Sequence, residues 1–320
     1  MSVTVVPGLR ALAVATGLVA HESRSLLRVT GADRTAFLQG MLSANVLRLG
    51  AGQHAPALFL TVQGRIVAIC EVLLESDSIL LDVAAEQAAA LRRGLEAFVV
   101  ADDVEIDETD ERAALIGGPF AEEALGHVLG SAIKALPVGH HALAAWSGGS
   151  LRVVRGVFAS VGDWRLWGSG ESIAAVCAAL REVGACEVGP EAAEIARILR
   201  GLPRVGVDWD ESTLAPEVPA LAAAIAGDKG CYLGQEVVER VAARGRVNWL
   251  VAALVLEQPA PRGAALLVKG EPAGELTSVA VSPLDGGIVA LARVRRSAVD
   301  EASELVVAGG GRAHLLAPQS

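Results

Sequence analysis

A lysine, a cysteine and the only tyrosine of the chain lie close together in GDKGCYLGQE, residues 227–236, and Lys229 is one of only three lysines. The glycines allow a tight bend, and the residues from Gly234 onward predict a helix, so Cys231 is expected just before a helix start. A helix N-terminus and a nearby ammonium group both favour the thiolate, which is the reactive form of cysteine. The stretch therefore predicts a functional thiol at Cys231, the alternative being an inert thiol buried in a glycine-rich bend.

The remaining cysteines suggest no metal or disulfide chemistry. Cys70, Cys177 and Cys186 show no C-x-x-C spacing and no neighbouring histidine, so the sequence predicts neither a zinc site nor a disulfide scaffold. No general base stands near Cys231 in the sequence, which gives no support to a protease-like Cys–His pair. Because no four-cysteine set can be assembled, a stable iron–sulfur cluster on this chain is not expected.

Charge and hydropathy narrow the classes of partner. The formal net charge of −10 over 320 residues argues against broad nucleic-acid binding, which needs a basic face. A local pocket for a small anion remains open, with candidates in RVAARGR (Arg240, Arg244, Arg246) and ARVRR (Arg293, Arg295, Arg296), although solvated arginines at element ends are the simpler reading. No apolar stretch reaches the roughly 20 residues of a membrane span. The run ALAVATGLVA lacks a convincing signal-peptide cleavage site. We expect a soluble, cytoplasmic protein.

Hydrophobic patterning of the first part predicts an α+β module. Residues 23–31 read as a strand, 32–46 as a helix capped by Asp33, and 54–76 as a β-hairpin turning at residues 63–65. A further strand ends near Asp82, a helix follows, and ADDVEIDE closes the module as a strand. Strands and helices joined by short turns favour an α+β layer over a repeated β-α-β winding.

The second part predicts another module and a barrel. Strands are expected in AALIGG, LRVVRGVF and GDWRLWG, helices in ESIAAVCAALREVGA and PEAAEIARILRG, and a loop-rich stretch over 117–150. After Trp249, five short strands at regular spacing predict a small β-barrel or sandwich. We place the modules at 1–110, 111–243 and 244–320, and we expect the first two to exchange segments to complete their sheets.

The motif KGCYLGQE resembles the K-G-C-[FY]-x-G-Q-E signature of the YgfZ family, folate-binding proteins related to the glycine-cleavage aminomethyltransferase. The resemblance extends over most of the chain, through GADRTAFLQGMLSANV, TVQGRIVA, LLDVAAEQAAAL, RILRGLPRVGVD, RGRVNWLVAAL and AGELTS. It implies an aminomethyltransferase-like ring of two α+β modules and a C-terminal β-barrel around a central cavity that admits tetrahydrofolate or another reduced folate.

The resemblance also implies a function in the assembly or repair of iron–sulfur clusters in client enzymes, including some that modify tRNA. The partners would be those clients and cluster-assembly factors, without direct nucleic-acid or membrane binding, and we expect a monomer. Cys231 is the residue on which activity would depend. The residues expected to line or support the folate site are Lys229, Tyr232, Gln235, Glu236, Arg240, Arg197 and Gln39.

Two departures from the related aminomethyltransferase bear on chemistry. That enzyme carries an aspartate pair shortly after the hairpin glycine, where this chain has Ala68 and Ile69, which can neither accept a proton nor hold a cation. Relatives also often carry a glutamate at the position of Leu199, with Gln39 and Glu217 as conceivable substitutes here. A folate-dependent accessory factor is therefore favoured over a one-carbon transferase. A structural adaptor is the third reading, and it predicts that Cys231→Ser leaves function intact.

Overall fold

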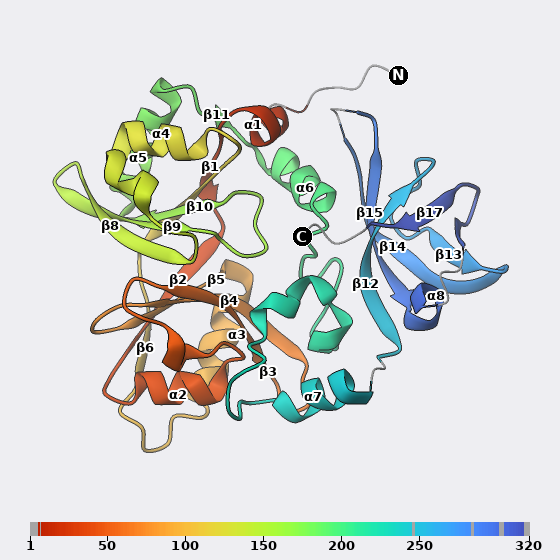
Figure 1. The fold of residues 1–320 in the computed structure, drawn as a ribbon, viewed down its shortest axis with the longest axis horizontal. Helices are drawn as coiled ribbons and strands as arrows, with labels where there is room; N and C mark the ends of the chain where they lie inside the picture. The colour runs from red at the N-terminus through yellow and green to blue at the C-terminus, as the bar shows by residue number, and fades with distance from the viewer. Residues whose placement is uncertain (1–5, 7, 245–246, 283–284, 301–303, 317–320) are drawn as a thin grey trace.

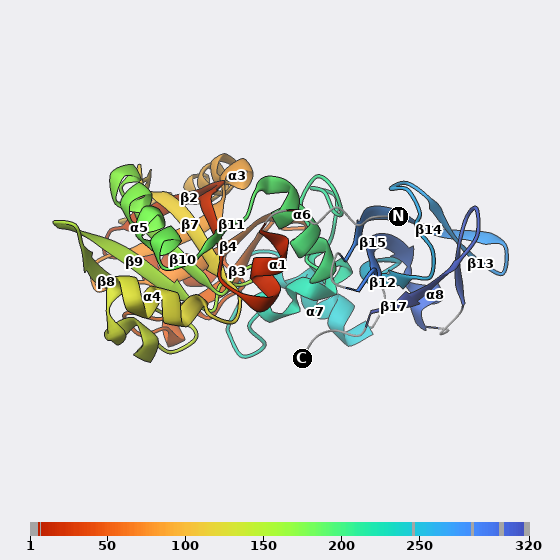
Figure 2. The same cartoon turned by 90° about the horizontal axis from the view of Figure 1, so that it is seen from above.

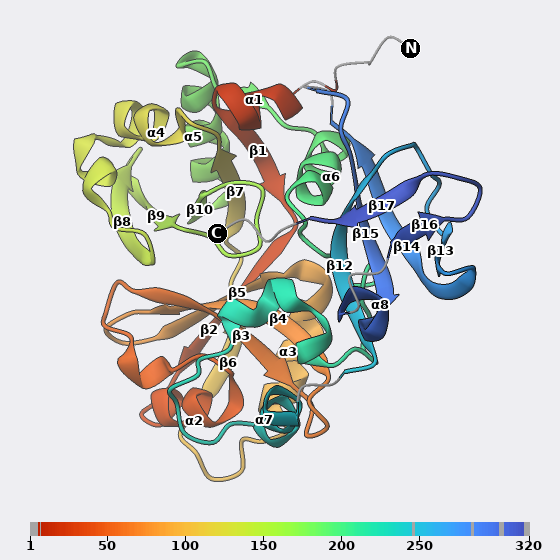
Figure 3. The same ribbon diagram turned by 45° about the vertical axis from the view of Figure 1, so that its right-hand side comes forward.

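The computed structural model describes residues 6, 8–244, 247–282, 285–300 and 304–316. Two β-sheets with their helices lie at one side of the molecule and a closed β-barrel lies at the other (Figure 1). The barrel occupies one end of the long axis (Figure 2), and the two sheets lie one above the other beside it (Figure 3). This arrangement confirms the predicted α+β class with a C-terminal barrel.

The first sheet has five strands and includes the predicted hairpin. Its strand order is β3 (His54–Leu60), β4 (Ile66–Leu74), β5 (Ile79–Ala84), β2 (Arg24–Thr30) and β6 (Glu105–Glu108). One face packs on α2 (Arg34–Met41), the short helix η1 (Val46–Arg48) and α3 (Ala85–Glu96), because alternate residues such as Ala68, Cys70 and Val72 point into that core. Asp33 precedes α2 as predicted, but its carboxylate accepts a hydrogen bond from the amide of Asp103 and does not cap the helix.

The second sheet has six strands and recruits the chain's first strand. Its order is β11 (Cys186–Glu187), β1 (Gly17–Glu22), β7 (Arg112–Gly117), β10 (Trp164–Gly168), β9 (Gly149–Arg155) and β8 (His140–Trp146), with α5 (Gly170–Glu182) packed on it. Strand β1 pairs with β7 and β11, so the expected first module contributes one strand to the second sheet, whereas all five strands of the first sheet come from residues 24–108 and none from the second module.

The predicted loop-rich stretch over 117–150 is wrong. It contains α4 (Ala121–Leu129), the short helix η2 (Ser131–Ala135) and β8. Gly126 weakens the helical pattern of α4 in the sequence, but a side chain there would lie 2.2 Å from the Lys134 stem of η2. The Lys134 side chain therefore lies over this glycine, which the pattern alone reads as a loop signal.

The barrel is closed by β12 (Trp249–Leu256), β15 (Ile288–Arg295), β14 (Glu271–Val281), β13 (Ala265–Val268), β16 (Leu305–Val307) and β17 (Arg312–Leu315), with α8 (Arg296–Asp300) against it. Helices α1 (Leu9–Val14) and α6 (Pro190–Leu199) pack together beside the second sheet, and α6 contacts β14 and β15 of the barrel. Alternation along the barrel strands buries one set of apolar residues inside, including Leu254, Leu266 and Val294.

The segment after α6 connects all three parts. It contains η3 (Ala215–Glu217), η4 (Pro219–Ala224) and α7 (Gln235–Arg244), and it packs on the β3–β4 hairpin. One apolar cluster joins Leu58 and Ile66 of the hairpin to Trp209, Tyr232 and the barrel residue Val251. This segment therefore lies where the first sheet and the barrel meet.

Candidate functional site

The loop before α7 is wedged between α2 and the β3–β4 hairpin. The amide of Leu233 donates to the carbonyl of Gly40 (2.9 Å). Gly234 has φ +82°, and a Cβ there would lie 2.5 Å from the carbonyl oxygen of Thr61, so only glycine fits this approach. The motif is thus held by backbone contacts on both sides.

Lys229 anchors this loop to the end of α2. Its ammonium group donates to the backbone carbonyls of Gln39 (2.8 Å), Leu42 (2.5 Å) and Ala44 (2.7 Å), and it lies 5.0 Å from the ring centre of Tyr232. Burial lowers the pKa of Lys229 to about 8, but only the protonated amine has three hydrogens for three carbonyls. The lysine predicted to activate Cys231 is therefore directed at the C-terminal end of a helix, whose partial negative charge suits a cation.

Cys231 is one of two exposed thiols among the chain's four cysteines. Cys70 and Cys177 are buried, and burial raises the pKa of both, that of Cys177 to about 11. Cys186 is exposed on the second sheet. The alternative of a buried thiol at Cys231 is therefore wrong, and a partner molecule can reach this sulfur. Helix α7 begins only at Gln235, so Cys231 lies in the loop and not in the first turn.

The other predicted site residues of the motif region make local contacts. Gln235 holds the loop, because its side-chain oxygen accepts from the amide of Tyr232 (3.1 Å). Tyr232 is buried in the apolar cluster, and burial raises its pKa to about 12. Glu236 and Arg240 pair with each other on the exposed side of α7. Gln39 accepts from the amide of Leu47 (3.3 Å) and contacts Asn45.

Arg197 forms a structural centre at the end of α6. It is buried, and its guanidinium donates to Glu194 (2.5 Å), to Asp208 (2.5 Å) and to Ser278 of the barrel (2.9 Å). Burial opposes its charge, but the two carboxylates outweigh this and raise the pKa of Arg197. The predicted folate-site arginine thus fixes the loop 202–208 against the barrel. Of the other arginines considered for an anion, Arg246 and the side chain of Arg244 lie outside the described residues.

Two cavities meet at Pro203. One, which we call the chamber, has a volume of about 120 Å³ and lies between β4, the start of α3 and the loops 158–159 and 203–209. The other, the barrel cavity, has about 620 Å³ and lies between residues 200–203, residues 219–220 and strands β12 and β15. Pro203 lines both, and Arg204 and Arg200 lie exposed beside it. At the junction of the two sheets and the barrel, the loop that contains Pro203 therefore has a cavity on each side.

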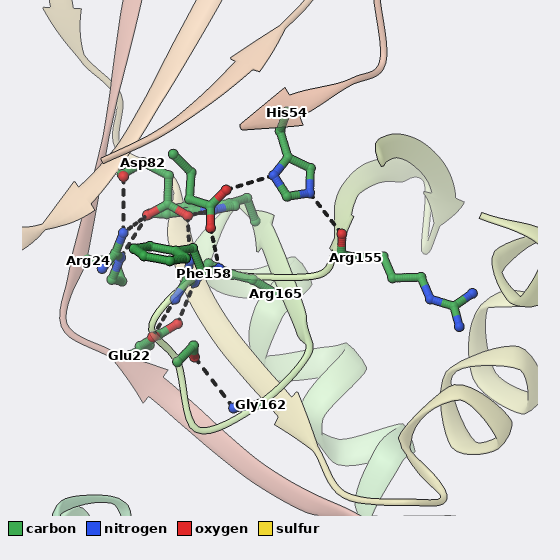
Figure 4. Close-up of polar contacts among 11 residues, drawn as sticks. Glu22, Arg24, His54, Asp82, Arg155, Phe158, Gly162 and Arg165 are labelled. Carbon is green, nitrogen blue, oxygen red and sulfur yellow. Dashed lines mark hydrogen bonds and ion pairs between the residues drawn. The ribbon is translucent and has the colours of Figure 1, made fainter. Parts of the chain in front are cut away.

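The chamber wall carries a polar network that joins the two sheets (Figure 4). The Glu71 carboxylate receives hydrogen bonds from His54 Nδ1 (2.7 Å) and from the amide of Phe158. Burial opposes the charged form of His54, but the hydrogen bond and charge of Glu71 outweigh it and raise the pKa of His54.

Deeper between the sheets, the fully buried Asp82 accepts from Arg24 (2.7 Å), Arg165 (2.7 Å) and Trp167 (3.3 Å). Burial disfavours the charge of Asp82, but the two guanidinium groups outweigh it and lower its pKa. Arg165 is also bound by Glu22 of β1 (Figure 4), so each buried charge has partners of opposite sign. Because Arg24 also lines the chamber, these contacts tie the first sheet to the second at the chamber wall.

Strand β4 determines which groups face the chamber. Ala68 is fully buried in the opposite core, whereas Ile69 and Glu71 lie on the face that lines the chamber. The apolar side chain of Ile69 thus faces the chamber at the position of the second aspartate of the related aminomethyltransferase. Leu199 lines a separate groove beside α1, and Glu217 accepts from the amide of Leu214 (3.1 Å), so neither supplies a polar group to the chamber.

Sequence reasoning missed Glu71 and Trp209 as chamber residues, and His54 as the partner of Glu71. The glutamate in the apolar strand IVAICEVLL was a detectable signal, because a charged residue on a strand with both faces buried needs a partner. Among the described residues, no group of three His, Cys, Asp or Glu side chains is arranged to hold a metal ion. No helix in the described part of the chain is long and apolar enough to cross a membrane.

Comparison with known proteins identifies the family. The model of the GCVT N-terminal domain matches residues 4–229. The chain belongs to the GCVT-domain family. It is 30% identical over 298 residues to an aminomethyltransferase of Rubrobacter xylanophilus, covering 86% of this chain and 74% of that one. An aminomethyltransferase of Thermus thermophilus is 29% identical over 284 residues, covering 88% and 79%. This GCVT-domain protein is therefore related to aminomethyltransferases.

Two further similarities extend this assignment. A protein of Arabidopsis thaliana named putative transferase At1g60990, chloroplastic, is 26% identical over 288 residues, and the match spans 88% of this chain but only 66% of the plant protein. The crystal structure of the glycine cleavage system aminomethyltransferase T from Bartonella henselae superposes with a TM-score of 0.84 at 18% identity, covering 97% of this chain and 88% of that one. The fold of this GCVT-domain protein is thus the aminomethyltransferase fold.

Proposed function

We propose that this GCVT-domain protein is a folate-binding accessory factor of the YgfZ type, which supports the assembly or repair of iron–sulfur clusters in client enzymes, including tRNA-modifying ones. The observation that carries the proposal is the presence in one chain of an exposed thiol, Cys231, and of an apolar residue, Ile69, on the chamber face of β4. A transferase needs an acid–base group beside its one-carbon unit, whereas an accessory factor needs an accessible thiol.

The residues at the junction fit a reduced folate. The chamber has polar wall groups for the edge of a ring, and the adjoining barrel cavity is lined by apolar residues such as Leu250 and Leu291. The glutamate tail carries carboxylates, for which Arg200 and Arg204 are better placed than Arg240, because Arg200 lines the barrel cavity and Arg204 the chamber, whereas Arg240 lines neither. Bound folate would supply a one-carbon carrier, and the chain's own residues would orient it.

Complementation tests the thiol. A strain that lacks its own YgfZ-type protein would receive the wild type, Cys231→Ser, or Cys186→Ser, which removes the other exposed thiol as a matched control. We expect wild type and Cys186→Ser to restore iron–sulfur enzyme activity and Cys231→Ser to fail. Full rescue by Cys231→Ser would contradict the thiol function and favour a structural adaptor.

Calorimetry tests the folate. Tetrahydrofolate should bind the purified protein, and a polyglutamylated form should bind more tightly at low salt if Arg200 and Arg204 hold the tail. Equal affinities for the two forms would contradict the contacts of Arg200 and Arg204 with the tail. If neither form binds, the folate part of the proposal is wrong. Aminomethyl transfer in the presence of the glycine-cleavage partner proteins would instead favour the runner-up, a folate-dependent one-carbon transferase.

Partners and location follow as further parts of the proposal. The clients are iron–sulfur enzymes together with cluster-assembly factors, the protein acts as a cytoplasmic monomer, and it binds neither nucleic acid nor membranes directly. Co-purification of client enzymes with a tagged chain, compared between the wild type and Cys231→Ser, tests the interaction with the clients.

A further inference from the structure

One buried donor in the chamber wall lacks an acceptor among the described residues. Trp209 lines the chamber, is 5% exposed and packs in the apolar cluster, and within the described part of the chain its indole Nε1–H has no hydrogen-bond partner. Buried polar groups are nearly always satisfied, so an unpaired donor in a cavity wall points to a missing water or ligand. The indole nitrogen can only donate, so the missing partner must present an acceptor.

The chamber also offers one carboxylate with spare capacity. Glu71 is 3% exposed, and each of its oxygens accepts one hydrogen bond, one from His54 and one from the amide of Phe158. A carboxylate has about four lone-pair sites, so two remain for a ligand. His54 fixes this carboxylate, since its second nitrogen donates to the carbonyl of Arg155 (2.8 Å) (Figure 4).

The other polar side chains of the chamber are either engaged or lie at its rim. Arg24 is bound to Asp82, and Gln87 contacts the backbone of Ile69 and Val67. Arg204 pairs with Glu194 (2.8 Å), and both Arg204 and Glu86 are exposed, which places them at the rim. Among the described residues, the free side-chain hydrogen-bonding capacity of the inner wall is therefore the donor of Trp209 and the acceptor sites of Glu71.

We infer that Trp209 and Glu71 form a donor–acceptor pair that selects a heterocycle whose edge carries a carbonyl oxygen beside an N–H group, as in the lactam ring of a pterin. The chamber volume of about 120 Å³ compares with the ~150 Å³ cavity that admits benzene, so it takes the edge of one ring. This inference rests on the proposed folate binding and assigns two side chains to ring specificity.

Calorimetry with small ring probes tests the pair. The probes are tetrahydropterin, its 4-amino counterpart, in which a donor replaces the carbonyl oxygen, and 4-aminobenzoylglutamate, which lacks the ring. Trp209→Phe removes the N–H group together with the five-membered ring of the indole. Trp146→Phe is the matched control, because it makes the same truncation at an indole whose N–H is also buried and without a partner among the described residues, but it packs against the core of the second sheet.

In the wild type, tetrahydropterin should bind at least tenfold more tightly than the 4-amino counterpart. Trp209→Phe should weaken tetrahydropterin binding about tenfold and shrink that preference, since the donor that the 4-amino group opposes is gone. Trp146→Phe should match the wild type for all probes, and 4-aminobenzoylglutamate should bind Trp209→Phe and wild type equally. In ¹⁵N-indole spectra of the wild type, tetrahydropterin should shift the signal of Trp209 and leave that of Trp146 in place.

Three results would overturn the inference in distinguishable ways. If tetrahydrofolate binds but Trp209→Phe retains full affinity for tetrahydropterin, the indole N–H donates to water and the pair does not recognise the lactam ring. The folate proposal stands in that case. An unshifted Trp209 signal in the presence of bound tetrahydropterin leads to the same conclusion without any variant. If no probe and no folate binds the wild type, the inference and the folate part of the proposed function both fall.

Discussion

Replacing Lys229 by methionine should loosen the motif loop from α2. The variant keeps the aliphatic stem but loses three hydrogen bonds, to the carbonyls of Gln39, Leu42 and Ala44. At a net contribution of about 1 kcal/mol per hydrogen bond, the free energy of unfolding should fall by about 3 kcal/mol. Hydrogen bonds to a charged group can contribute about 1.5–3 kcal/mol each, but water can solvate part of the helix end in the variant, which keeps the expected cost below that range.

Urea unfolding followed by circular dichroism measures this loss. Lys269→Met is the matched control, because Lys269 is an exposed lysine on the barrel and should change stability by less than about 0.5 kcal/mol. The variant's loop should also admit proteases between α6 and α7 more readily than the control. If Lys229→Met and Lys269→Met unfold at the same urea concentration, Lys229 does not anchor the loop.

Three further outcomes are expected. Gly234→Ala should cost about 2 kcal/mol or more in thermal or urea unfolding because of its positive φ and the Thr61 carbonyl, whereas Gly230→Ala, with open space around it, should be nearly neutral. Burial and Arg152 lower the pKa of His141 to about 4, so the folded state resists protonation of this histidine. The free energy of unfolding should therefore fall by up to ~3 kcal/mol as the pH drops from 6.5 to 4, and His141→Gln should reduce this dependence on pH. Alkylation of the native protein, followed by peptide mass spectrometry, should modify the exposed Cys186 and Cys231 and should leave the buried Cys70 and Cys177 unmodified. Protection of Cys231 from alkylation would contradict its exposure.

Local patterns in the sequence determined much of the first sheet and the barrel. The hairpin at residues 63–65, helices α2 and α3 and the closely spaced strands after Trp249 were predicted, because alternation, turn residues and helical periodicity act over a few neighbours. The motif at 227–236 also marked the loop that exposes Cys231. These features need no knowledge of distant contacts.

Only the tertiary structure decided the direction of Lys229 and the content of the chamber. Lys229 binds a carbonyl 190 positions away, and the Glu71–Phe158 contact spans 87 positions. The pairing of β1 with β7 in the second sheet is equally non-local. Spacing along the chain carries no information on which distant backbone groups a flexible side chain meets, because that depends on how whole sheets and helices pack. The sequence therefore located the loop that carries Cys231, while the fold determined the contacts of Lys229 that anchor this loop and the side chains that line the chamber.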